Sequence, residues 1–146
     1  MSLLPHARSF TDLIVYRKAR TVANRLFEVS KNFPKDEMYS LTDQLRRSSR
    51  SIGAQIAEAW AKRRYEKHFI SKLTDADAEQ QETRHWIETA SDCAYLTPAE
   101  VLSLNGNLSE IGKMLNSMIE KADSFCGETT MVLKESTIEY FTTDNR

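Results

Sequence analysis

The 146-residue sequence is poor in glycine, proline and cysteine, with four, three and two of these residues. Because glycine and proline supply most tight turns, their scarcity argues against an all-β protein and favours long helices. Cys93 and Cys126 are too few and too distant for a disulfide framework or a C-x-x-C metal or redox pair. No apolar run approaches the ~20 residues that span a bilayer, and residues 1–10 lack the apolar centre of a secretion signal. We therefore expect a soluble, cytoplasmic, helical protein.

Charge is balanced over the whole chain but unevenly placed along it. The net charge is −1, yet residues 1–72 hold 15 Lys and Arg against 7 Asp and Glu, whereas residues 73–146 hold 5 against 14. An imbalance of this size indicates an electrostatic partner for the basic half. The alternative is that the two halves neutralise each other, within one chain or between subunits.

Four segments repeat apolar residues at three- and four-residue steps, as amphipathic helices do. The first begins near residues 9–12 and ends before Phe33-Pro34, since the residue preceding a proline disfavours the helical conformation. The second covers about 36–64, the third begins within 64–67 and continues to Ala94, and the fourth ends by Gly127. Thr97, Pro98 and Glu100 predict that the fourth helix starts with a capping box.

Similar helix lengths and short connections predict an all-α fold, an up-down-up-down antiparallel four-helix bundle. The bundle domain spans residues 1–126. Residues 127–146 carry no helical pattern and are expected to form an extended or mobile C-terminal tail, with a short strand at Thr137–Phe141 as an alternative.

The second segment has a ladder of small residues, Gly53, Ala57 and Ala61, at four-residue steps. Such a ladder lets another backbone approach closely. Glycine within a helix costs about 0.5–1 kcal/mol relative to alanine, so Gly53 needs compensation. Close packing of these three residues at a subunit interface would supply it. The alternative is that the alanines only favour helix formation and that Gly53 is tolerated.

No set of residues specifies a reaction, and we expect neither catalysis nor a metal or other cofactor. A di-metal site in a four-helix bundle needs two Glu-x-x-His pairs, and Glu82-x-x-His85 is the only one. Neither cysteine has a histidine close in sequence. We expect Glu79 and Glu82 to pair instead with arginines of the second helix.

The densest positive charge lies between residues 46 and 72, and the sequence contains no base-reading motif that would accompany it. Arginine suits phosphate oxygens, and Tyr65 and His68 could stack on bases. We therefore expect nucleic acid to bind through backbone charge and shape, at eight candidate residues: Arg46, Arg47, Arg50, Lys62, Arg63, Arg64, Lys67 and Lys72.

Residues 10–120 resemble the bacterial 23S rRNA intervening-sequence family, small four-helix-bundle proteins that are often encoded within ribosomal RNA genes. The resemblance is carried by the runs Asp12-Leu-Ile-Val-Tyr16, Phe33-Pro34, Gln44-Leu-Arg-Arg-Ser48, Ile56-Ala-Glu58, Phe69-Ile70, Glu82-Thr83 and Trp86-Ile87. The family usually has glycine where this chain has Ala59 and Ala61. Alanine at both positions favours an uninterrupted helix.

The resemblance implies a ring-like homo-oligomer, typically a pentamer. A related family, the accessory variability protein of diversity-generating retroelements, forms pentameric bundles that bind nucleic acid and a reverse transcriptase. The resemblance therefore implies RNA or DNA, and a larger nucleic-acid enzyme, as partners. The alternative is an oligomeric scaffold or protein-interaction module whose basic and acidic halves pair at subunit contacts. Neither hypothesis involves a membrane.

Overall fold

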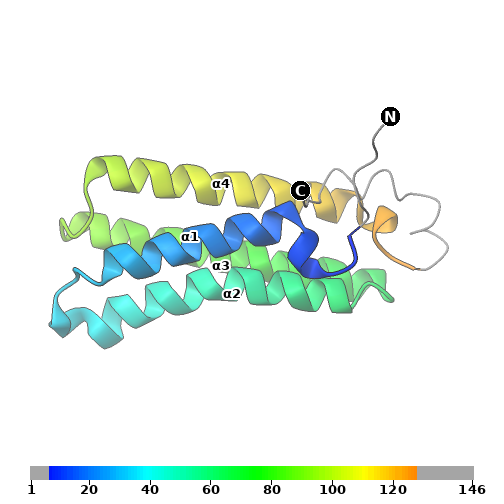
Figure 1. The fold of residues 1–146 in the computed structure, drawn as a ribbon, viewed down its shortest axis with the longest axis horizontal. Coiled ribbons are helices and arrows are strands. Elements are labelled where there is room, and N and C mark those ends of the chain that lie inside the picture. Colours follow the sequence, from blue (N-terminus) through cyan, green and yellow to red (C-terminus); the bar gives the residue numbers. More distant parts are fainter. Residues whose placement is uncertain (1–6, 128–146) are drawn as a thin grey trace.

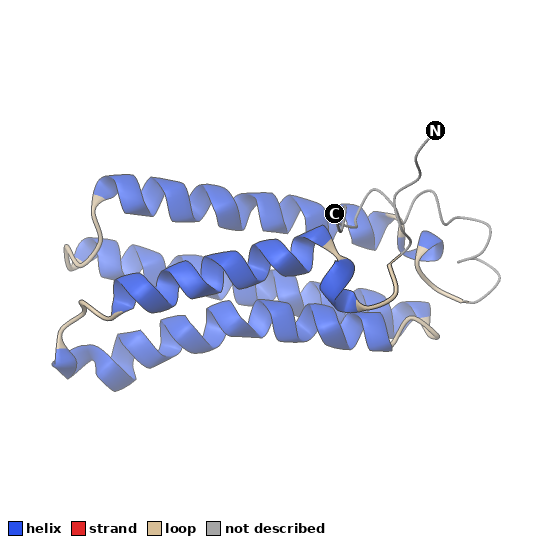
Figure 2. Cartoon of the chain, in the orientation of Figure 1, coloured by secondary structure: helices blue, strands red, loops and turns tan. Residues whose placement is uncertain are grey.

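The computed structural model describes residues 7–127, and every element in that range is helical (Figures 1 and 2). The four α-helices are α1 (Ile14–Ser30), α2 (Asp43–Ala61), α3 (Glu66–Asp92) and α4 (Pro98–Glu120). Each packs along two others, α1 against α2 and α4, and α3 against α2 and α4. The prediction of an all-α fold with four helices is confirmed. The predicted tail and its alternative strand at Thr137–Phe141 lie outside the described residues.

The connections alternate between the two ends of the bundle in Figure 1, where α1–α2 and α3–α4 join at the left and α2–α3 joins at the right. The α2–α3 turn contains neither glycine nor proline, and it closes because Tyr65 N–H donates to the carbonyl of Lys62 at 3.1 Å. The helix α4 begins with the predicted capping box between Thr97 and Glu100. It ends at Glu120, earlier than the predicted Gly127.

Helix α3 ends in a Schellman motif. Tyr95 N–H donates to the carbonyl of Ala90 at 2.9 Å, and Ala94 takes the left-handed conformation with a φ of 60°. The sequence pattern placed Ala94 in the apolar stripe of this helix. In the structure Ala94 is exposed, because it follows the end of α3. The Tyr95 hydroxyl then donates to Glu37 at 2.9 Å, in the connection before α2. This hydrogen bond raises the pKa of Tyr95 to about 12.

The two N-terminal helical segments differ from their predicted starts. The residues expected to begin α1 form a separate 3-10 turn, Phe10–Asp12, which Ser9 caps. The chain from 35 onwards forms a 3-10 turn, Lys35–Glu37, and a π-helical turn, Met38–Thr42, before α2. The wider π turn buries the consecutive residues Leu41 and Thr42.

The core consists of one apolar stripe from each helix. The stripes predicted by periodicity are buried, with Leu45, Ile52 and Ile56 of α2 having no exposed surface. Polar contacts also lie within this core, where the Thr83 hydroxyl donates to Ser48 at 2.9 Å and Ser48 donates to the carbonyl of Leu45 at 3.2 Å. No helix in the described range is both long and apolar enough to cross a membrane.

The capping box gives a stability prediction. The Thr97→Ala variant is expected to lower the free energy of unfolding by about 1 kcal/mol, because the amide of Glu100 loses its acceptor. Urea denaturation followed by circular dichroism measures this change. The exposed α4 residue Ser103 provides a control, since Ser103→Ala removes a hydroxyl that caps nothing. Equal stability of the two variants would contradict the assignment.

Candidate nucleic-acid interface

The eight basic residues singled out in the sequence lie in three places. Arg47 lies on α2 and faces α3, and Lys72 lies on α3 and faces α2. Arg46 and Arg50 lie between α1 and α2. The remaining four surround the α2–α3 turn, and we call them the corner: Lys62, Arg63, Arg64 and Lys67.

Arg47 and Lys72 are held by carboxylates of their own chain. Arg47 pairs with Glu79 at 3.4 Å and with Glu82, and Lys72 pairs with Glu58 at 3.4 Å. The prediction that Glu79 and Glu82 pair with an arginine of the second helix is confirmed. The Trp86 indole donates to Glu82 at 3.0 Å, and together with Arg47 it lowers the pKa of that carboxyl.

Arg63 has a structural role within the corner. Its guanidinium lies 3.5 Å from the centre of the Trp60 ring, and its Nε donates to the Trp60 carbonyl at 2.9 Å. Burial lowers the pKa of this guanidinium. The backbone carbonyl of Arg63 accepts a hydrogen bond from the amide of Gly127 at 3.2 Å. This bond ties the corner to the end of the described chain.

The other three corner residues project into solvent. Lys62, Arg64 and Lys67 are exposed, and within residues 7–127 no carboxylate forms an ion pair with any of them. The exposed ring of Tyr65 lies among them, with its centre 5.4 Å from that of His68. The corner thus combines three exposed cations, which outnumber the exposed carboxylate of Glu66 among them, with an accessible aromatic pair.

Arg46 and Arg50 gather on a ring that the sequence analysis did not single out. Their guanidinium carbons lie 4.5 and 5.1 Å from the centre of Phe27, and Lys31 Nζ lies 4.9 Å from it. Arg46 is half-buried and donates to Ser30 at 2.8 Å, whereas Arg50 is exposed. The apolar spacing of α1 gave no sign that the Phe27 ring would contact cations of α2.

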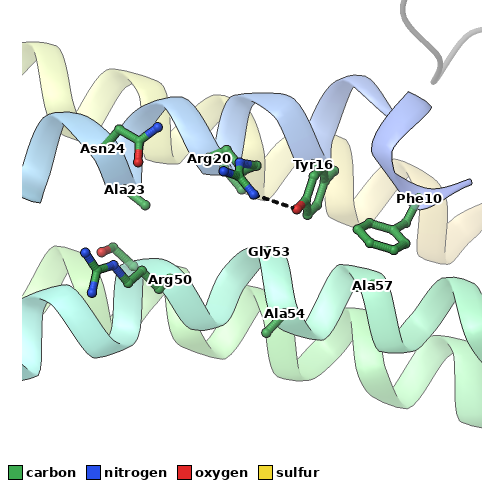
Figure 3. Close-up of a pocket in the computed structure, with 11 residues that line it drawn as sticks. Phe10, Tyr16, Arg20, Ala23, Asn24, Arg50, Gly53, Ala54 and Ala57 are labelled. Atoms are coloured by element: carbon green, nitrogen blue, oxygen red, sulfur yellow. Dashed lines mark hydrogen bonds between the residues drawn. The ribbon is translucent and has the colours of Figure 1, made fainter.

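A groove of about 390 Å³ runs between α1 and α2, and Figure 3 shows the residues that line it. The small-residue ladder forms part of its floor. Gly53 is buried under Tyr16, since a Cβ added there would lie 3.4 Å from a Tyr16 ring carbon. A Cβ at this distance makes an ordinary van der Waals contact, so the Tyr16 ring does not by itself require glycine at position 53. Ala57 lines the groove and Ala61 is exposed.

The residues considered for chemistry are dispersed. The described residues contain no group of three or more His, Cys, Asp and Glu side chains that could hold a metal. His85 is exposed and packs edge-on against Trp86. Burial raises the pKa of the Cys126 thiol to about 11, which keeps it protonated at neutral pH.

Comparison with known proteins places this arrangement in a family. A sequence model of the 23S rRNA-intervening sequence proteins matches residues 11–117. The crystal structure of a protein of unknown function from the S23 ribosomal protein family of Bacteroides thetaiotaomicron is similar, with a TM-score of 0.67 and 32% identity. The match covers 73% of this chain and 96% of that one. No curated protein matches the sequence.

The Glu82 ion pair predicts a pH-dependent contribution to stability. Because the folded-state pKa of Glu82 is lowered, its contribution is present above about pH 5 and is lost as pH falls through that lowered pKa. Glu82→Gln is expected to cost up to about 1 kcal/mol at pH 7, since the pair is partly exposed, and less at pH 3.

Urea denaturation at both pH values measures this difference. Glu88→Gln, which alters an exposed glutamate of the same helix, is the control. A Glu82→Gln effect that is equal at pH 3 and pH 7 would show that the carboxylate charge contributes nothing.

Proposed function

This chain belongs to the 23S rRNA-intervening sequence protein family, and we propose that it is a non-catalytic cytoplasmic protein that binds RNA or DNA through its corner. One observation carries the proposal: Lys62, Arg64 and Lys67 are exposed around one turn without ion-pair partners in the described chain. The exposed carboxylate of Glu66 lies in the same turn, but it forms no ion pair with these three cations, and positive charge is in excess. A cluster with excess positive charge is the electrostatic footprint of a polyanion site.

The charge pattern within the bundle narrows the proposed site. Arg47 and Lys72 are neutralised by carboxylates of α2 and α3, so they contribute less to the field at the surface than their charge suggests. Arg63 positions the turn through Trp60. Phosphate contacts are therefore assigned to the three remaining corner residues, with Arg50 as a further contact on the α1–α2 face.

The proposed contacts carry no sequence preference. Lysine and arginine contacts to phosphate fix position but do not read bases. Tyr65 and His68 can stack on any unpaired base, because every base has an aromatic face. Affinity should therefore depend on strand charge and length.

Assembly is part of the same proposal. We infer that the up-down-up-down bundle forms a ring-like homo-oligomer of five subunits, the number that the family resemblance implies. A ring would present several corners to one strand, so that weak contacts combine through effective concentration. A larger nucleic-acid enzyme is a proposed partner, since the protein would hold a strand without acting on it.

An oligomeric scaffold is the second candidate function. It is favoured by the groove between α1 and α2, where small residues would let a helix of another subunit approach closely. The ion pairs within the chain weigh against it, because they already neutralise part of the basic half. Light scattering separates the assembly question from binding, and a monomer at tens of micromolar would contradict any oligomeric proposal.

Salt dependence tests the nucleic-acid proposal. About three phosphate contacts per engaged subunit give a log–log slope of affinity against salt of roughly −2 to −3. The variant Lys62→Gln/Arg64→Gln/Lys67→Gln is expected to bind labelled RNA and DNA uniformly more weakly and to flatten this slope. Fluorescence anisotropy at several salt concentrations measures both quantities.

The control variant removes the same charge from other surfaces. Lys35, Arg84 and Lys113, each changed to Gln, lie before α2, on α3 and on α4, and none of them forms an ion pair within the described chain. Their loss should leave the slope nearly unchanged. If the wild type fails to bind at 50 mM salt, or if both variants lose affinity equally, the corner is not the site.

A further inference from the structure

We propose that the groove between α1 and α2 binds one unpaired nucleotide of a single-stranded nucleic acid, an inference that rests on the proposed function. The groove is separate from the corner, since none of its lining residues belongs to the α2–α3 turn. Its volume of about 390 Å³ lies within the ~300–1,000 Å³ range of small-molecule sites.

The floor of the groove is flat and apolar because its residues are small. Ala19 and Ala23 of α1 face Gly53, Ala54 and Ala57 of α2. No side chain on this floor extends beyond a methyl group. The Tyr16 ring covers Gly53, so a planar base could lie on Ala54 and Ala57 beside this ring.

The charge of the groove selects an anionic ligand. Arg20 and Arg50 line it, and none of the lining residues in the described chain is acidic. Arg50 rests on Phe27 beside Arg46, and Lys31 lies against the same ring. Lys31 is paired with Glu28 at 3.2 Å, whereas no carboxylate in the described chain forms an ion pair with Arg46 or Arg50. A bound phosphate would interact favourably with these two guanidinium groups. A guanidinium stacked on a ring keeps its N–H groups available to phosphate oxygens.

One end of the groove is charged and polar and the other is aromatic, as the phosphate and the base of a nucleotide are. In Figure 3, Arg50 and Asn24 lie at one end, whereas Tyr16 and Phe10 lie at the other. The Tyr16 and Phe10 rings pack edge to face, with centres 4.9 Å apart, and Arg20 donates to the Tyr16 hydroxyl at 3.1 Å. The phosphate is assigned to the end with Arg50, and the base is assigned to the end with Tyr16 and Phe10.

This assignment predicts a preference for single strands. A base can enter a groove between two helices only after it leaves its own stack. In a duplex this step loses the energy of base pairing and stacking. The corner has no such requirement, since it contacts phosphates. The groove would thus add strand selectivity to the charge-based binding of the corner.

A groove-filling variant tests the inference in the full-length protein. Ala57→Leu places a larger apolar side chain at the aromatic end without changing charge, and Ala78→Leu makes the same change on an exposed position of α3. We expect Ala57→Leu to weaken binding of a fluorescein-labelled 20-nucleotide RNA at least about fivefold, the lower end for one base–aromatic stacking contact. Binding of the corresponding duplex, and binding by Ala78→Leu, should remain within twofold of wild type.

Photo-crosslinking gives a second readout. An RNA containing 4-thiouridine should crosslink to peptides that include Phe10, Tyr16 or residues 53–57, identified by mass spectrometry. Arg50→Gln should reduce this crosslink, whereas Lys113→Gln on α4 should not. Circular dichroism and thermal unfolding of each variant confirm that it folds.

The outcomes separate this inference from the proposed function. Normal binding of single strands by Ala57→Leu, with crosslinks confined to the corner, would overturn the nucleotide site and leave the corner proposal intact. A fall in the light-scattering mass of Ala57→Leu would show that a second copy of the chain occupies the groove, which also overturns the inference. Absence of any nucleic-acid binding by the wild type at 50 mM salt would overturn both.

Discussion

The rotation of α2 about its own axis determines which neighbouring helix each of its side chains contacts. Burial of Leu45, Ile52 and Ile56 fixes that rotation, since these side chains have no exposed surface. With that face fixed, the small residues meet α1 and Arg47 meets α3. Neighbouring residues on a helix point about 100° apart, so the adjacent Arg46 and Arg47 reach different helices, α1 and α3 respectively. One buried stripe thus separates the basic residues into groups with different partners.

The sequence predicts the fold well where local chemistry acts alone. The capping box at Thr97 needs only residues 97–100, and the stripes of α2, α3 and α4 repeat over many turns. Predictions were less accurate at helix ends. Phe10–Asp12 forms a separate 3-10 turn, and Ala94 takes a left-handed conformation that is unusual for a residue with a Cβ. Apolar periodicity describes neither feature, because the first is set by the Ser9 cap and the second by hydrogen bonds from Ala94 and Tyr95 to the end of α3.

The candidate site was less predictable than the fold, because charge neutralisation depends on tertiary contacts. The sequence shows eight basic residues close together. It does not show that Arg47 and Lys72 form ion pairs, or that Lys62, Arg64 and Lys67 form none within the described chain. The pairing of Glu79 and Glu82 was an exception, since their spacing on one helix face was visible. The role of Phe27 could not be foreseen, because it depends on how α1 lies beside α2.

The hydrogen bond between Tyr95 and Glu37 joins the two connections at one end of the bundle. Neither connection can open without breaking it, so amide hydrogens of residues 31–42 and 93–97 should exchange with solvent as one cooperative unit. The α2–α3 turn at the opposite end belongs to a different unit, tied instead to residue 127. The two ends of the bundle are therefore expected to open independently. The end that carries the corner can change conformation on binding a ligand while the other end stays closed.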